Sequence, residues 1–214
     1  MSIKFTEDEF DLFAELINVA MGRSAADLAK LFNHFVELKV PTISIASSES
    51  IPQTVIENSM FNEGESVTVV QQKFSNSDIL NGRGVILFSD NTKQAILPLL
   101  DLTLDDIESD DIYDFLLELS GQLIGSCLSN LFNQFFKTVV KFSSPEMISE
   151  NQTVRHIAYS SFELDHDVYG DILCSKINFV INKVNFQCDL FFFIDTKSLG
   201  FLQKSLQETL SEMF

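Results

Sequence analysis

The chain has 214 residues, of which 31 are acidic and 14 are basic, and its net charge is −17. This charge would repel a nucleic-acid backbone or an anionic membrane surface, so neither is expected as a partner. The length, the 45% content of hydrophobic residues and the count of only 4 Pro predict one compact domain covering residues 1–214. The first residues lack a signal peptide's basic start and apolar core, and no apolar run reads as long enough to span a membrane, which together predict a cytoplasmic protein.

Apolar periodicity and turn residues predict the elements of the first part of the chain. They are helices at 7–21 and 24–37, a strand at 41–47, a short helix at 52–60, strands at 66–74 and 83–89 around a loop at 75–82, and a helix at 91–100. The first two helices are predicted to separate near Gly22 and Arg23, with Ser24 to Asp27 as a capping box for the second. An acidic, aperiodic segment at 102–111 then joins the two parts of the chain.

The second part of the chain repeats the order of helices before strands. Helices are predicted at 110–124 and 126–136, strands at 138–143, 153–163, 172–182 and 185–194, and a terminal helix at 197–212. This order predicts an α/β (α+β) fold with a largely antiparallel sheet covered by helices. The apolar segment 190–194 would promote aggregation at a sheet edge, so it is predicted to be a buried central strand.

The sequence also repeats itself internally. A shift of 103 positions pairs Glu15 with Glu118 and Gly22 with Gly125 at helical spacing. Further along, GVILFSDNTKQAILPLL resembles CDLFFFIDTKSLGFLQKSL, so both parts end alike. A period of about a hundred residues indicates a duplicated half-domain rather than a solenoid, with pseudo-repeat halves at 1–103 and 104–214.

A row of polar residues lies on the first predicted helix. At 100° per residue, Asp11, Glu15 and Asn18 fall within about 60° of one another, with Gly22 in the same row. Apolar residues flank the row on both sides. The row could be the exposed strip of a helix that is buried on both sides. Its recurrence in the second half favours a shared functional surface.

The spacing of Asp11, Glu15, Asn18 and Pro41 resembles the site motif of the CheC/CheX/FliY family of response-regulator aspartyl-phosphate phosphatases. In that motif Asp or Ser is followed by Glu, then Asn, then Pro at the same spacings. The organisation in two halves resembles CheC over nearly the full length. The resemblance implies a CheC-like fold and a hydrolase that removes phosphate from a phosphorylated CheY-like receiver in chemotaxis or another two-component pathway.

The resemblance also implies roles for the motif residues. Asn18 would orient the attacking water and Glu15 would contact the receiver's active-site lysine, so these two are the expected catalytic residues. Asp11 would be an accessory residue at the rim or a cap. The Mg²⁺ would be supplied by the receiver, because the chain's own residues, including its three cysteines, show no metal-ligand spacing and predict no cofactor or metal site.

The second copy departs from the motif. Asp114 and Glu118 are present, but Gly121 stands at the amide position and the proline comes one place late, at Pro145. This copy is therefore expected to be a degenerate second site. Gln122 could offer an amide, but one position along a helix turns a side chain by 100°.

Two other functions stay open on the sequence alone. One is a non-catalytic adaptor that binds a receiver, a CheD-like deamidase or a flagellar switch component. The other is a small-molecule sensor with a pocket between the halves, for which no residue specifies a ligand. A homodimer is compatible with each of these functions.

Overall fold

The structure is a computed structural model that describes residues 5–32, 37–38, 42–77, 79–97, 109–160, 171–181 and 186–213. The first part of the chain forms α1 (Glu7–Phe32), β1 (Glu37–Leu38), β2 (Thr42–Ser47), the 3-10 turn η1 (Ser48–Ser50), α2 (Ile51–Asn58), β3 (Ser66–Asn76), β4 (Leu80–Ser89) and α3 (Thr92–Ile96). The second part forms α4 (Ser109–Phe135), β5 (Lys141–Phe142), β6 (Glu146–Thr153), α5 (Val154–Ser160), β7 (Asp171–Ile181), β8 (Phe186–Ile194) and α6 (Thr196–Met213). Pro41, the end of the predicted helix 91–100 and most of the predicted linker 102–111 lie outside the described residues.

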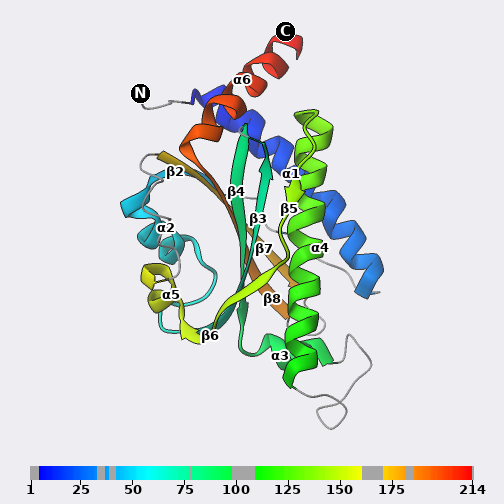
Figure 1. Cartoon of the computed structure of the whole chain (residues 1–214), viewed down its shortest axis with the longest axis vertical. Helices are drawn as coiled ribbons and strands as arrows, with labels where there is room; N and C mark the ends of the chain where they lie inside the picture. The colour runs from blue at the N-terminus through cyan, green and yellow to red at the C-terminus, as the bar shows by residue number, and fades with distance from the viewer. Residues whose placement is uncertain are drawn as a thin grey trace.

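Eight strands of the described chain form one sheet, and every strand pairing in it is antiparallel. The order is β1-β7-β8-β4-β3-β5, with β2 also paired to β7 and β6 also paired to β3. The sheet runs through the middle of the molecule with helices on both sides (Figure 1). The prediction of an α+β fold with an antiparallel sheet covered by helices is confirmed.

The two parts of the chain interlock in this sheet. β2 of the first part pairs with β7 of the second, and β6 of the second part pairs with β3 of the first. The strand order reads the same from either edge when β1, β2, β3 and β4 are exchanged with β5, β6, β7 and β8, respectively. A duplicated half-domain would produce this symmetry, which supports the predicted halves 1–103 and 104–214, although the division itself stays a prediction.

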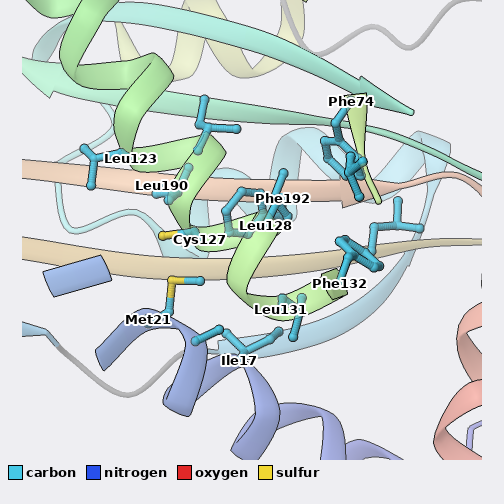
Figure 2. Close-up of a cluster of buried hydrophobic side chains, with 14 of the residues drawn as sticks. Ile17, Met21, Phe74, Leu123, Cys127, Leu128, Leu131, Phe132, Leu190 and Phe192 are labelled. Carbon is cyan, nitrogen blue, oxygen red and sulfur yellow. The ribbon is translucent and has the colours of Figure 1, made fainter. Parts of the chain in front are cut away.

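The helices pack on the two faces of the sheet and bury a core on each side. On one face, α1, α4 and α6 cover the larger core, and α2 and α5 cover the smaller core on the other face (Figure 1). Figure 2 shows part of the larger core, built from Ile17 and Met21 of α1, Cys127, Leu128, Leu131 and Phe132 of α4, and Leu190 and Phe192 of β8. Phe191 and Phe193 belong to the smaller core, so β8 is buried on both faces. The prediction that segment 190–194 is a central strand is confirmed.

The predicted breaks in the two long helices are wrong. α1 runs unbroken through Gly22, and α4 runs unbroken through Gly125. Ser24 does not cap a second helix, because its hydroxyl donates to the Ala20 carbonyl one turn earlier, within α1. A glycine costs an exposed helix position only about 1 kcal/mol, and the burial of residues on both sides of Gly22 outweighs that cost.

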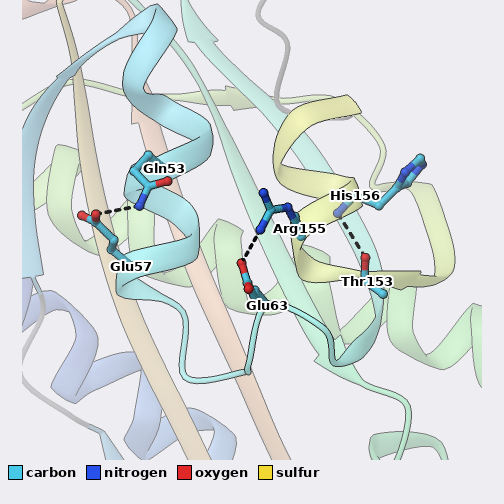
Figure 3. Close-up of polar contacts among 6 residues, drawn as sticks. All are labelled: Gln53, Glu57, Glu63, Thr153, Arg155 and His156. Carbon is cyan, nitrogen blue, oxygen red and sulfur yellow. Dashed lines mark hydrogen bonds and ion pairs between the residues drawn. The ribbon is translucent and has the colours of Figure 1, made fainter.

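The predicted strand 153–163 is also wrong, because its first part is the helix α5. The side-chain hydroxyl of Thr153 accepts a hydrogen bond from the backbone N–H of His156 at 3.2 Å, as an N-cap residue does (Figure 3). Val154, Ile157 and Ala158 are buried at the i, i+3, i+4 spacing of a helix face. The strand of this region is β6, which precedes α5 and pairs with β3.

Two boundaries differ by less. The predicted strand 138–143 contracts to β5, and the predicted loop 75–82 contracts because β3 and β4 stay paired as far as Asn76 and Leu80. Ser77 closes this tight hairpin with a positive φ of 47°, a conformation that polar turn residues tolerate.

α4 contains the one described helix that is long and apolar enough to cross a membrane, by length and composition only. Its window within Asp111–Phe135 has a mean hydropathy of 1.2, so the expectation that no apolar run reaches that length is wrong for this helix. Half of the window is buried in the fold, and a core helix of a globular protein passes the same test. α4 packs against α1 and β3.

Candidate functional site

The start of α1 is fixed by hydrogen bonds that set the orientation of the whole helix. The Glu9 backbone N–H donates to the Thr6 hydroxyl at 3.2 Å, and the Thr6 backbone N–H donates to the Glu9 carboxylate at 2.8 Å. This reciprocal pair is a capping box. The side chains of Gln203 and Gln207 on α6 also donate to the Glu9 carboxylate, at 3.0 and 2.7 Å. Glu9, although acidic, is therefore buried and bonded on all sides, and it holds α1 against α6.

The buried face of α1 determines what the helix exposes. Phe13, Ile17 and Met21 are each only 1% exposed and point into the larger core. The opposite side of the helix presents Asp11, Glu15, Asn18 and Gly22 to solvent, and all four are exposed. We call these four residues the α1 row. Beside it lies Val19, which is 37% exposed, so the polar row has an apolar neighbour at the surface.

The polar side chains of the α1 row have no partner within the described part of the chain. Neither hydrogen bonds nor ion pairs engage Asp11, Glu15 or Asn18 there, whereas the Glu9 carboxylate, near the start of the same helix, accepts several hydrogen bonds. No described residue therefore competes with another molecule for the carboxylate of Glu15 or the amide of Asn18. They stand on one helix, at a spacing of three residues that keeps them on one side.

The corresponding row of α4 is differently occupied. Asp114 and Glu118 are exposed, as predicted for a second copy, but the Glu118 carboxylate accepts a hydrogen bond from the Gln122 side chain at 3.2 Å. Gly121, at the position of the missing amide, has Pro145 packed against it. A Cβ atom at Gly121 would lie 3.0 Å from Pro145 Cγ, which is closer than ordinary van der Waals contact. The late proline therefore occupies the space that an asparagine side chain would need.

A groove of about 310 Å³ separates the two long helices beside these rows. It is lined by Ser24 and Asp27 of α1 and by Gln122 and Ser126 of α4. Gln122 thus points to the groove and to Glu118, and it does not replace the amide at Gly121. α1 and α4 are also joined directly, through a hydrogen bond between the side chains of Arg23 and Gln134.

The described thiols cannot serve as nucleophiles. Burial raises the pKa of the Cys127 thiol to about 12, against smaller opposing effects of Ser24 and Ser126. Burial, with the nearby Asp189 charge, raises the pKa of the Cys188 thiol well above its usual range. Both therefore stay protonated at neutral pH, in the core and away from the α1 row. The side chain of Cys174 lies outside the described residues.

The described residues contain no group of three or more His, Cys, Asp or Glu side chains that could hold a metal ion.

The residues predicted from sequence lie in two rows. Asp11, Glu15 and Asn18 form one open row, and Asp114 and Glu118 belong to a second row that Pro145 restricts. Pro41, the fourth motif residue, falls outside the described residues. Sequence reasoning missed Glu9, although the pattern Thr6-x-x-Glu9 is a readable capping-box signal.

Comparison with solved structures shows which fold this is. FliY of Thermotoga maritima overlays with a TM-score of 0.71 at 15% identity, covering 96% of this chain and 99% of that one. FliM in a FliG–FliM complex from H. pylori overlays with a TM-score of 0.60 at 10% identity, covering 94% and 100%. A CheC-like superfamily protein from Shewanella overlays with a TM-score of 0.50 at 13% identity, covering 89% and 99%. The sequence matches no protein-family model and no curated protein.

These overlays show that the chain has the fold of the CheC/CheX/FliY family, which the FliM middle domain shares. At identities of 15% or less they establish the fold alone. They group the chain by architecture with proteins of chemotaxis and of the flagellar switch.

Proposed function

We propose that this chain is a phosphatase that hydrolyses the aspartyl phosphate of a phosphorylated, CheY-like receiver domain docked on the α1 row. The observation that carries the proposal is that Glu15 and Asn18 lie together on one side of a helix in this fold. Both are exposed, and neither has a bonding partner in the described chain. An idle solvated face would be expected to mix charges with long basic side chains, which the row from Asp11 to Gly22 lacks.

In this proposal the chain acts by positioning. The Asn18 side chain can accept one hydrogen bond from a water and donate another, which fixes the water in line with the bond that breaks. It needs no change of protonation to do so. Holding a reactant in place in this way can supply several kcal/mol of the barrier reduction. Glu15 would bind the lysine in the receiver's site and set the depth of Asn18, and Asp11 would contact the rim.

The attacking group is the water, and no residue of this chain forms a covalent intermediate in the proposal. Mg²⁺ is a component of the receiver and neutralises charge on the phosphoryl group there. The proposal places the reaction in the cytoplasm and leaves the pathway that uses it undefined.

The test is the rate of phosphate release from a Mg²⁺-bound, phosphorylated CheY-type receiver with and without this chain. Wild type should accelerate release, and Asn18→Ala should lose about 100-fold in rate, the size of effect seen when one preorganised amide is removed from an enzyme site. Asn133→Ala is the matched control, because Asn133 is an exposed asparagine on α4 outside both rows. Glu118→Ala should also keep full activity if only the α1 row works.

The second candidate is a non-catalytic interaction protein that binds a receiver, a CheD-like protein or a component of the flagellar switch. The overlay on FliM from a FliG–FliM complex favours it, because that protein is seen bound to a partner. A wild-type chain that binds the phosphorylated receiver without accelerating phosphate release would decide for this candidate and against the phosphatase.

A further inference from the structure

Gly22 extends the α1 row one turn beyond Asn18, and nothing within the described chain explains why it is a glycine. Glycine weakens an exposed position in the middle of a helix relative to alanine. A Cβ atom added at Gly22 would have no neighbour within 4 Å. Gly22 lies inside a regular helix, so no left-handed backbone conformation requires it either.

Other glycines of the same structure show what a packing requirement looks like. A Cβ atom at Gly84 would lie 2.8 Å from Ile124, and one at Gly82 would lie 2.3 Å from Phe74 and 2.5 Å from the Phe193 carbonyl oxygen. These two positions exclude a side chain because the fold itself fills the space. Gly22 differs because it is exposed and no atom of the described residues would lie within 4 Å of a Cβ atom there.

The second copy keeps the same feature. Gly125 occupies the equivalent position on α4, and a Cβ atom there would also have no neighbour within 4 Å. A destabilising glycine thus stands at the same place in both rows, and the described residues supply no cause for it in either. Docking by a partner would account for Gly22 directly, and Gly125 keeps the same residue type on a row that Pro145 restricts.

We propose that Gly22 is the contact point at which the receiver presses against the bare backbone of α1, and that this close approach lets the short Asn18 side chain reach the bound phosphoryl group. The inference rests on the proposed function. Residues 18 and 22 are four apart, so they lie on one side of the helix about one turn from each other. An asparagine reaches less far than a glutamate, so the partner's surface must come nearer to the helix at Asn18 than at Glu15. A side chain at position 22 would hold that surface away.

The proposal predicts that stability and activity change in opposite directions. Gly22→Ala should raise the Tm by about 2 °C, because alanine favours the helix. In phosphate release from the Mg²⁺-bound, phosphorylated CheY-type receiver, it should raise KM for the receiver about tenfold, a cost of about 1.4 kcal/mol in binding. Gly22→Leu, with a longer side chain, should raise KM further, with little change in Tm relative to alanine.

Gly125→Ala is the matched control, since it makes the same substitution at the equivalent place on α4. It should raise the Tm like Gly22→Ala and leave KM unchanged, because Pro145 restricts that row.

An unchanged KM in both Gly22 variants would overturn the inference while leaving the phosphatase proposal intact. A wild-type chain that releases no phosphate would overturn the phosphatase proposal, and the inference would then be judged by receiver binding alone. The inference about Gly22 would be overturned if wild type and Gly22→Leu bound the phosphorylated receiver equally well, or if neither bound it.

Discussion

α1 and α4 are the same kind of helix at the same place in the repeat, yet they present different chemistry. They end at Phe32 and Phe135, which the shift of 103 positions superimposes, and both bury one face in the same core. Their exposed acids are equivalent. What differs is the amide: α1 offers Asn18 in the open, and α4 has Gly121 beneath Pro145.

The contrast between the two helices shows that the fold and the candidate site are constrained separately. Losing the amide from α4 leaves the buried face of that helix intact, because Leu116, Leu119 and Leu123 still fill the core. A duplicated protein can therefore keep two packed helices and only one open row. Substitutions at Gly121 and Pro145 can test whether these few residues alone close the second row.

The largest effect is expected from reopening the α4 row. In an Asn18→Ala background, the double substitution Gly121→Asn with Pro145→Ala should restore phosphate release by up to about 100-fold, the amount lost with one preorganised amide. Gly121→Asn alone should restore almost no phosphate release, because the Cβ atom of the new side chain would lie only 3.0 Å from Pro145 Cγ. Pro145→Ala removes that atom. The measurement is phosphate release from the Mg²⁺-bound, phosphorylated receiver.

Two outcomes would contradict this prediction. Equal recovery by the single and the double variant would mean that Pro145 does not obstruct the row. No recovery by a double variant that folds normally would mean that the α4 row lacks more than an amide, with the Glu118–Gln122 hydrogen bond as the next obstacle to remove.

The next effect concerns how the two helices are anchored at their starts. α1 is held to α6 by the buried Glu9 carboxylate, whereas the equivalent position on α4 is the partly buried, apolar Ile112. Hydrogen bonds to a charged group contribute about 1.5–3 kcal/mol each to stability. Glu9→Gln should therefore lower the free energy of unfolding at pH 7 by about 2 kcal/mol, measured by denaturant titration.

The same substitution should change the pH dependence of stability. Burial alone would raise the pKa of the Glu9 carboxyl, but hydrogen bonds from Gln203, the Thr6 backbone N–H and Gln207 together lower it below its ordinary value of 4.5. A lowered folded-state pKa stabilises the fold above pH 4.5, and that contribution is lost as the pH falls through the folded-state pKa. Wild type should thus lose more stability than Glu9→Gln between pH 5 and about pH 3. Glu7→Gln, an exposed acid in the same first turn, should behave like wild type.

The α1 row and the fold class could be predicted from the sequence, because both depend on local periodicity and on the repeat. The row of Asp11, Glu15 and Asn18 follows from helical spacing alone, and the structure leaves these residues exposed. The break at Gly22 was predicted from a local signal that tertiary packing overrides. The repeat itself indicates the helix α5, because shifting the predicted helix 52–60 by 103 positions gives 155–163, which overlaps α5.

Other features depend on contacts that no local pattern specifies. Gly121 and Pro145 meet only because β6 folds back to pair with β3, which brings the segment before it against α4. Glu9 meets Gln203 and Gln207 across nearly the whole length of the chain. Such contacts need the strand order, and the sequence does not give that order.

The smallest effect is expected at Gln122, whose hydrogen bond to Glu118 has no counterpart at Glu15 in the described chain. Its side chain donates to Glu118 at 3.2 Å, on the surface and with an i, i+4 spacing, so it contributes only about 0.2–0.5 kcal/mol to stability. Gln122→Ala should therefore leave the unfolding free energy within about 0.5 kcal/mol of wild type. It should also leave phosphate release unchanged, because the proposed function uses the α1 row alone. A clear loss of release in this variant would show that the groove between α1 and α4, which Gln122 lines, belongs to the working site. The comparison would then no longer be between one open row and one closed row, because both helices would face the same bound receiver.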